Sequence, residues 1–294
     1  MNIGVPKEIK DNEKRVALTP SGARDLVASG NSVFIETEAG KGSGFQDDLY
    51  VNAGAVILSN AAEVFKSSQL ILKVKEPQPE EVDRLNEKHT LFTFFHFAAS
   101  KKLTTTCKES GATCIAYETV QNLDGSLPIL IPMSEVAGRM AIQNGAKCLE
   151  GNMGGKGKLL GGVPGVMPSK VTIIGGGIVG TNAAKMAAGL GADVSILDVN
   201  MDRLRYLDDT MEKNVTTIYS NNHNITSHLK KTDLLVGAVL IVGEKAPNLV
   251  SKDMLSFMPE GSVIVDVAVD QGGCVETCKP TTHKDPTYTV GGIV

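Results

Sequence analysis

The 294-residue sequence has no tryptophan, and aromatic residues make up only 4% of it. This scarcity disfavours a platform on which nucleobases or sugars could stack. Charge of one sign is also missing, because 29 lysines and arginines face 33 acidic residues and the formal net charge is −4. Such a chain has no general affinity for nucleic acid or for an anionic membrane surface. We therefore expect neither as a partner.

Long apolar runs and paired cysteines are absent as well. No stretch reaches the roughly 18 apolar residues that a membrane-spanning helix needs, and the longest, 234–242, is typical of a buried strand. The N-terminus lacks the apolar core of a secretory signal. The five cysteines are scattered, with no CxxC pair and no partners at zinc-ligand spacing. They predict no metal site and favour small buried thiols in a reducing cytoplasm.

Glycine, in contrast, is in excess. Its 31 residues are about a tenth of the chain, against an average of about 7%, so many backbone positions need a positive φ or a close approach. Seven glycines and two prolines fall within residues 151–168, a loop too long to be idle. We expect this loop, together with a glycine turn at 175–180, to lie at and beside a cofactor site.

Length and periodicity predict two α/β domains. At about 150 residues per domain, the chain is long enough for two. Strand-like and helical segments alternate up to residue 116 and again over 171–265, which indicates parallel sheets covered by helices. A linker with glycine and proline, 123–133, precedes an amphipathic helix at 134–149. We predict two Rossmann-like domains, a first domain of 1–130 and a second of 131–294, with an active-site cleft between them.

The strongest local signal is the GxGxxG pattern of Gly175, Gly177 and Gly180. An apolar strand precedes it, a helix rich in alanine follows it, and a second strand ends at Asp198, about 20 residues further on. The glycines permit a tight turn, the approach of a pyrophosphate to the helix N-terminus and close packing. Asp198 suits the ribose hydroxyls of NAD and repels the 2′-phosphate of NADP. Arg203 either contacts the same ribose or serves on the surface.

Three charged or titratable residues of the first half have two interpretations each. Lys75 and His96 follow apolar strands, at the sheet edge where α/β proteins bind ligands, and could orient an anion and carry a proton. Each could equally be an ordinary strand end or surface residue. Arg15 suits bidentate capture of a carboxylate, although its charged surroundings are also typical of a solvated loop. Asp270 of the second half is either a ligand-edge carboxylate or a turn residue.

Several motifs resemble one known family. The segments GVPKEI at 4–9, EKRVALTP at 13–20 and LKVKEP at 72–77 are similar to those shared by alanine dehydrogenases and the NAD-binding subunit of nicotinamide nucleotide transhydrogenases. The segments FHFAA at 95–99, IGGGIVG at 174–180 and DVAVDQGG at 266–273 resemble the alanine dehydrogenase version. The resemblance covers essentially the whole chain.

The resemblance implies a cytoplasmic enzyme that converts L-alanine, NAD and water reversibly into pyruvate, ammonium and NADH. It implies that His96 is the general acid/base and Asp270 its partner, that Arg15 clamps the substrate carboxylate, and that Lys75 contacts this carboxylate and polarises the keto oxygen. It also implies a homohexamer and closure of the two domains. The positions that match cofactor contacts of the family are Ser134, Ile178, Val179, Asp198, Ser220, Val239, Leu240 and Val267.

The family pattern extends several dozen residues beyond Val294, so the resemblance implies that a segment returning to the first domain is lacking here. Two other interpretations remain open. One is the NAD-binding component of a transhydrogenase, which would use no pair of His96 and Asp270. The other is a catalytically impaired, NAD-binding relic or fragment of the alanine dehydrogenase family.

Overall fold

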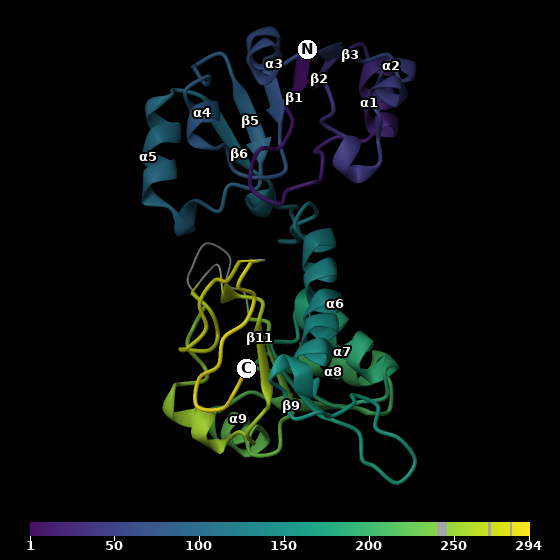
Figure 1. The fold of residues 1–294 in the computed structure, drawn as a ribbon, viewed down its shortest axis with the longest axis vertical. Coiled ribbons are helices and arrows are strands. Elements are labelled where there is room, and N and C mark those ends of the chain that lie inside the picture. The colour runs from purple at the N-terminus through teal and green to yellow at the C-terminus, as the bar shows by residue number, and fades with distance from the viewer. Residues whose placement is uncertain (240–245, 270–271, 283) are drawn as a thin grey trace. The chain divides into compact units, whose positions relative to one another are not determined.

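The computed structural model describes residues 1–239, 246–269, 272–282 and 284–294. The chain divides into two compact units, Met1–Leu130 and Ile131–Val294 (Figure 1). Each unit contains one parallel sheet with helices on its faces, as the alternation of strands and helices predicts. The fold class is thereby confirmed. No helix of the described residues is long and apolar enough to cross a membrane.

The first unit has a six-stranded sheet in the order β3-β2-β1-β4-β5-β6. The strand order reverses between β1 and β4, and a parallel sheet binds ligands outside the carboxyl ends of the strands at such a switch point. The strands are β1 (Asn2–Val5), β2 (Ser32–Glu36), β3 (Val56–Leu58), β4 (Leu70–Leu72), β5 (Thr90–Thr93) and β6 (Thr113–Ala116). The helices are α1 (Pro20–Ala28), α2 (Asp47–Asn52), α3 (Ala61–Ser67), α4 (Pro79–Val82) and α5 (Lys101–Glu109), with short 3₁₀ turns η1 (Lys41–Ser43), η2 (Phe97–Ala99) and η3 (Tyr117–Thr119).

The second unit has a five-stranded sheet in the order β11-β10-β7-β8-β9, with its switch point between β10 and β7. The strands are β7 (Lys170–Ile174), β8 (Asp193–Asp198), β9 (Val215–Tyr219), β10 (Leu234–Gly237) and β11 (Val263–Asp266). The helices are α6 (Ile131–Cys148), α7 (Ile178–Gly189), α8 (Met201–Thr210) and α9 (Asn222–Leu229), with 3₁₀ turns η4 (Gly151–Met153) and η5 (Asp253–Phe257).

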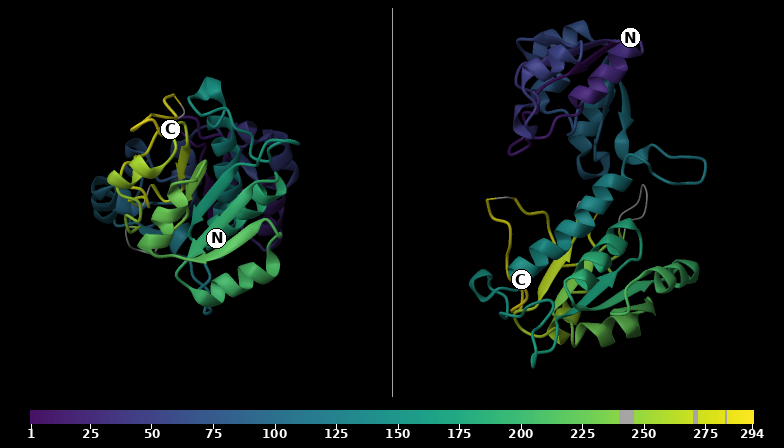
Figure 2. Two further views of the ribbon diagram at one scale, coloured as in Figure 1. Left: turned by 90° about the horizontal axis from the view of Figure 1, so that it is seen from below. Right: turned by 90° about the vertical axis from the view of Figure 1, so that its right-hand side faces the viewer.

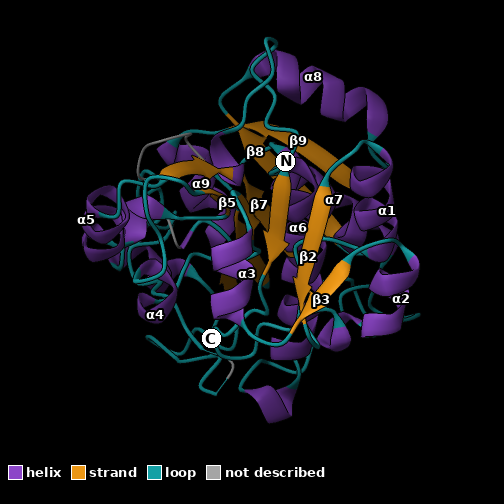
Figure 3. Cartoon of the chain, turned by 90° about the horizontal axis from the view of Figure 1, so that it is seen from above, coloured by secondary structure: helices purple, strands orange, loops and turns teal. Residues whose placement is uncertain are grey.

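Each sheet is covered on both faces by apolar packing (Figure 3). In the first unit, Tyr50 of α2 and Phe65 of α3 are almost completely buried in separate clusters. In the second, Ile142 of α6 packs with the alanines of α7, while Ile225 of α9 belongs to a separate cluster. The central strands β1, β7 and β10 are consequently buried on both sides, which explains why they appear in the sequence as continuous apolar runs.

Proline lies in the first turn of two helices, and the prediction of the start was correct for one of them. Thr19 caps α1 and Pro20 is its first residue, as their order predicts. Helix α6 starts at Ile131 rather than at Ser134, because Pro132 is tolerated in a first turn, where the amide lacks a helical partner. The short elements α2, β3 and α4 were not predicted, since their three to six residues are too few to show a period.

The glycine-rich segment 151–168 does not lie beside the glycine turn, so that expectation is wrong. Lys158 Nζ contacts Asp233 Oδ2 at 2.7 Å, and Lys156 pairs with the other oxygen of the same carboxylate. Asp233 directly precedes β10 and also accepts the amide of Lys170, the first residue of β7, at 2.7 Å. The segment is therefore held at the amino edge of the sheet, opposite to its ligand edge.

Helix α6 packs closely along α7 (Figure 2). The contact passes through Gly138, where a Cβ would lie 2.2 Å from the carbonyl oxygen of Val179 and 3.0 Å from the Cβ of Asn182. Backbone cannot yield at such a distance, so the absence of a side chain at Gly138 sets the separation of the two helices.

We predict that Gly138→Ala lowers the free energy of unfolding by about 1–3 kcal/mol, because the added methyl group overpacks this contact. Gly189→Ala is the matched control, since a Cβ there meets nothing within 4 Å. It should be neutral or raise the free energy by up to about 1 kcal/mol, owing to the better helix propensity of alanine. Urea titrations followed by circular dichroism measure both, and equal responses of the two variants would contradict the prediction.

Candidate functional site

The glycine turn joins β7 to α7 at the switch point of the second sheet. Gly175 has a φ of +107°, and a Cβ on it would lie 2.6 Å from the carbonyl oxygen of Ala238, which follows β10. A Cβ on Gly180 would lie 1.8 Å from the carbonyl oxygen of Gly175. Both positions therefore require glycine for purely steric reasons.

Gly177 differs from the other two glycines, because a Cβ on it would meet nothing within 4 Å. It is the N-cap of α7, and no side chain caps this helix end. Ile178, the first residue of the helix, is exposed, and Val179 is half-buried. Among the described residues, which leave out 240–245 and 270–271, no side chain caps the N-terminus of this twelve-residue helix, and the positive end of the helix dipole favours an anion there.

Asp198 ends β8, the strand next to β7. Its Oδ2 accepts the amide of Gly176 at 2.6 Å, and its Oδ1 accepts the amide of Asn200 at 2.8 Å. The carboxylate is therefore held against the glycine turn. Arg203 lies on the other side of the turn: its Nε donates to the carbonyl of Gly176 at 2.6 Å and its Nη2 to the hydroxyl of Thr181 at 2.7 Å. This geometry gives Arg203 a role in bracing the turn.

The remaining cofactor candidates of the second unit mostly follow strands at the same edge. Ser220 follows β9, and its amide donates to the carbonyl of Asp198 at 2.9 Å. Val239 follows β10 beside Gly175, and the amide of Val267, just after β11, donates to the carbonyl of Gly237 at 2.9 Å. Ser134 lies in the first turn of α6 and is half-buried. Leu240 and Asp270 lie outside the described residues.

Asp266 has a structural role that its position at the end of β11 does not reveal. Its Oδ2 accepts the amides of Cys274 at 2.7 Å and Val275 at 3.0 Å, and its Oδ1 accepts that of Ala268 at 3.0 Å. Burial raises the pKa of this carboxyl group, and the three amides counteract the shift. Asp266 therefore shapes the loop that follows β11.

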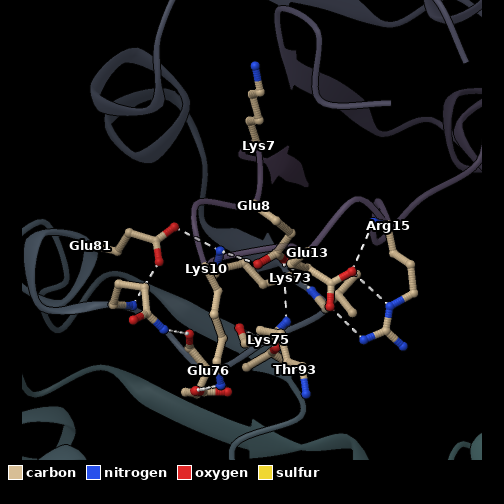
Figure 4. A network of polar contacts seen from close by, with 12 residues as sticks. Lys7, Glu8, Lys10, Glu13, Arg15, Lys73, Lys75, Glu76, Glu81 and Thr93 are labelled. Carbon is tan, nitrogen blue, oxygen red and sulfur yellow. Dashed lines mark hydrogen bonds and ion pairs between the residues drawn. The ribbon is translucent and has the colours of Figure 1, made fainter. Parts of the chain in front are cut away.

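Arg15 lies on the long connection after β1, at the switch point of the first sheet. Its Nε and Nη2 donate to the two carboxylate oxygens of Glu13 at 2.8 and 2.6 Å, and its side chain is 46% exposed. These hydrogen bonds, with a smaller contribution from the Lys75 ammonium, hold the pKa of Glu13 down to about 2. The Lys75 ammonium is thus close enough to the pair of Arg15 and Glu13 to influence its carboxylate electrostatically (Figure 4).

Lys75 is held in place through its backbone by residues from two other segments. Glu8, on the connection after β1, accepts the amides of Val74 at 2.6 Å and Lys75 at 3.4 Å. The hydroxyl of Thr93, the last residue of β5, donates to the carbonyl of Lys75 at 2.9 Å. The backbone from which Lys75 projects is thereby fixed after β4, which lies between β1 and β5 (Figure 4).

A buried ion cluster supports this arrangement. Lys73 Nζ lies 3.0 Å from Glu8 Oε2 and 2.8 Å from Glu81 Oε1 of α4, and all three side chains are at most 3% exposed. Burial raises the pKa of Glu81, and the Lys73 ammonium opposes this shift. The sequence analysis missed the cluster. The only signal was a lysine in an apolar strand, LILKV at 70–74, whose charge needs a buried partner.

His96 follows β5 at the same edge and is half-buried. Its backbone is left-handed, with φ +50° and ψ +44°, which costs a residue other than glycine about 1–3 kcal/mol. Its ring stacks on Phe94 with the centroids 6.1 Å apart and an interplanar angle of 15°. The loops after β4 and β5 therefore bring Lys75 and His96 to one edge of the first sheet, as their positions after strands predict. Arg15 lies on the connection that leaves β1 at the same edge.

The low pKa of Glu13 gives a testable pH dependence. An acid whose pKa is about 2 in the folded chain and 4.5 in the unfolded chain stabilises the fold fully above pH 4.5, and this stabilisation is lost as the pH falls toward 2. The free energy of unfolding of the native chain should exceed that of Glu13→Gln at pH 6, and the difference should shrink by pH 3.5. Urea titrations at both pH values measure it, and a constant difference would refute the assignment.

Comparison with known proteins agrees with this architecture. Residues 4–137 match the family model described as the N-terminal domain of alanine dehydrogenase/PNT, and residues 141–294 match the model of its C-terminal domain. Alanine dehydrogenases of Methanococcus maripaludis and Halomonas elongata are 57% and 55% identical over the whole chain, which covers 79% of each of them.

Solved structures give the same result. A structure titled L-alanine dehydrogenase superposes with a TM-score of 0.94 at 54% identity, covering all of this chain and 81% of that one. The transhydrogenase of Sinorhizobium meliloti superposes with a TM-score of 0.84 at 26% identity, over all of this chain and 84% of that one. The family resemblance predicted from the motifs is confirmed, and the chain belongs to the alanine dehydrogenase/PNT family.

Proposed function

We propose that the protein is an L-alanine dehydrogenase that uses NAD. The reaction converts L-alanine, NAD⁺ and water into pyruvate, ammonium, NADH and a proton, and it runs in both directions. The observation that carries the proposal is the 54–57% identity to alanine dehydrogenases along the entire chain. The transhydrogenase alternative is less favoured, because the transhydrogenase structure is only 26% identical.

The residues of the second sheet edge fit a dinucleotide. At Gly177, a Cβ would meet no described residue within 4 Å, and a pyrophosphate at the N-terminus of α7 would accept backbone amides there. Asp198 would accept the ribose hydroxyls, with Ser134, Ile178, Val179, Ser220, Val239, Leu240 and Val267 as the further contacts that the family pattern proposes. When bound, the nicotinamide ring accepts a hydride from the substrate.

The residues of the first sheet edge fit a small amino acid or keto acid. Arg15 would hold the substrate carboxylate, which competes with Glu13 for the guanidinium. The Lys75 ammonium would polarise the keto oxygen. His96 would take a proton from the water that attacks iminopyruvate, and Asp270 would assist as its partner. In the reverse direction, the same groups would return the proton and release water. The homohexamer and the cytoplasmic location stay predictions.

We predict that Asp198→Ala raises the dissociation constant for NAD by about 10- to 100-fold, because hydrogen bonds to a charged acceptor are lost. Affinity for NADP should fall much less, since the carboxylate also repels the 2′-phosphate. Asp202→Ala is the control, because the Asp202 side chain is 91% exposed and pairs with Arg205 on its own helix. Isothermal titration calorimetry measures binding. Equal losses for the two nucleotides would contradict the ribose role.

We predict that His96→Gln lowers the kcat for L-alanine by at least about 100-fold, since the general acid/base is removed. NADH binding should stay within twofold of the native value. Absorbance at 340 nm reports the rate, and fluorescence reports binding. Turnover that survives the substitution would overturn the role of His96, and NADH binding without turnover in the native chain would favour the non-catalytic interpretation.

A further inference from the structure

The left-handed backbone of His96 needs a restraint from elsewhere in the fold. Among the described residues, only Asn12 and Glu38 share a positive φ without being glycine. Such a conformation persists where the surrounding structure enforces it, and it is frequent at functional sites. The ladder between β5 and β6 ends at the pair of Thr93 and Ala116, so the amides of Phe95 and His96 lie beyond its strand partners.

The carboxylate of Glu118 takes these two amides. Its Oε1 accepts the His96 amide at 2.7 Å, and its Oε2 accepts the Phe95 amide at 3.3 Å. Glu118 belongs to η3, which directly follows β6, and it is half-buried. The carboxylate therefore accepts hydrogen bonds from backbone amides just beyond the end of the strand ladder, where His96 adopts the left-handed conformation.

Aromatic packing fixes the turn that carries Glu118. Its neighbour Tyr117 meets the rings of Phe92 and Phe94 edge to face, with centroids 4.3 and 5.0 Å apart. Burial raises the pKa of Tyr117 to about 12. Phe94 in turn stacks on the ring of His96. Glu118 and His96 are thus joined twice, by two backbone hydrogen bonds and through this aromatic row.

We propose that Glu118 is a positioning residue for the reaction: its carboxylate holds the His96 backbone in the left-handed conformation and so orients the imidazole. The proposal rests on the proposed function, in which His96 transfers a proton. A carboxylate suits the task because each oxygen accepts one amide. A glutamine side chain has one accepting oxygen and one donating NH₂ group, so it can satisfy only one of the two amides.

The test compares Glu118→Gln with Glu109→Gln, a matched control on the exposed side of α5. We expect Glu118→Gln to lower kcat for L-alanine roughly 10- to 100-fold, because small displacements of a reacting group have such effects. The KM for pyruvate should stay within twofold, since Arg15 and Lys75 are untouched. Glu109→Gln should leave both unchanged. An unchanged kcat, or a loss seen only in KM, would overturn the proposal.

A spectroscopic signal tests the positioning without relying on activity. The chain has five histidines, so the ¹³Cε1–¹H signals of labelled protein are few, and the signal of His96 is the one missing from His96→Gln. Glu118→Gln should shift this signal and leave those of the other histidines in place. Shifts spread over all of the signals would mean a general loosening and would refute a specific role.

Two further variants separate this proposal from the function on which it rests. In the His96→Gln background, Glu118→Gln should cause no further loss of kcat, because Glu118 acts through His96. Multiplying losses would show an independent role and overturn the proposal. If His96→Gln alone keeps its turnover, the proposed function fails, whereas the shift of the His96 signal in Glu118→Gln still reports the positioning.

Glu118→Asp is a milder change, because it keeps both carboxylate oxygens, and its kcat should lie between those of the native chain and Glu118→Gln. The proposal would be refuted if Glu118→Asp and Glu118→Gln both kept the native kcat.

Discussion

The ligand edge of the first unit depends on one buried ammonium group. Lys73 directly follows the buried strand β4 and its side chain is only 1% exposed, so its charge must be balanced in place. Glu8 and Glu81 approach it from the connection after β1 and from α4. Glu8 uses its second oxygen to accept the amides of Val74 and Lys75. A single electrostatic requirement thereby joins the connection after β1 and helix α4 to the end of β4, and it fixes the backbone from which Lys75 projects.

In the second unit, the corresponding sheet edge is organised by glycines, which have no side chains. Gly138, Gly175 and Gly180 each lie where a Cβ would be closer than 2.7 Å to a carbonyl oxygen. The glycine turn is therefore positioned by backbone contact with α6 and with the loop after β10, and Asp198 and Arg203 brace it from either side. One sheet edge is organised by charge neutralisation and the other by steric exclusion, although both follow the same parallel topology.

Much of this architecture could be predicted from the sequence, because periodicity and the glycine pattern are local signals. The strands that lead to Lys75, His96 and Gly175 were predicted within a few residues, and the position after a strand was enough to bring candidates to the correct edge. The partners of these residues were not predictable. Glu118 follows His96 by 22 residues, and only the pairing of β5 with β6 brings the two together. The location of segment 151–168 was predicted wrongly, because abundant glycine indicates backbone freedom but not which edge of a sheet the loop occupies.

The location of segment 151–168 determines where the chain can accept insertions or deletions. Ion pairs with Asp233 hold the segment at the amino edge of the second sheet, and a bridge between Val163 and Val166 closes its tip. A Cβ on Gly165, at this tip, would meet no described residue within 4 Å. Exposed tips of this kind tolerate insertions. An insertion or deletion at this tip would leave the glycine turn in place, because the two lie at opposite edges of the sheet. We therefore expect variation in length to be tolerated at the amino edge more readily than at the edge of the glycine turn.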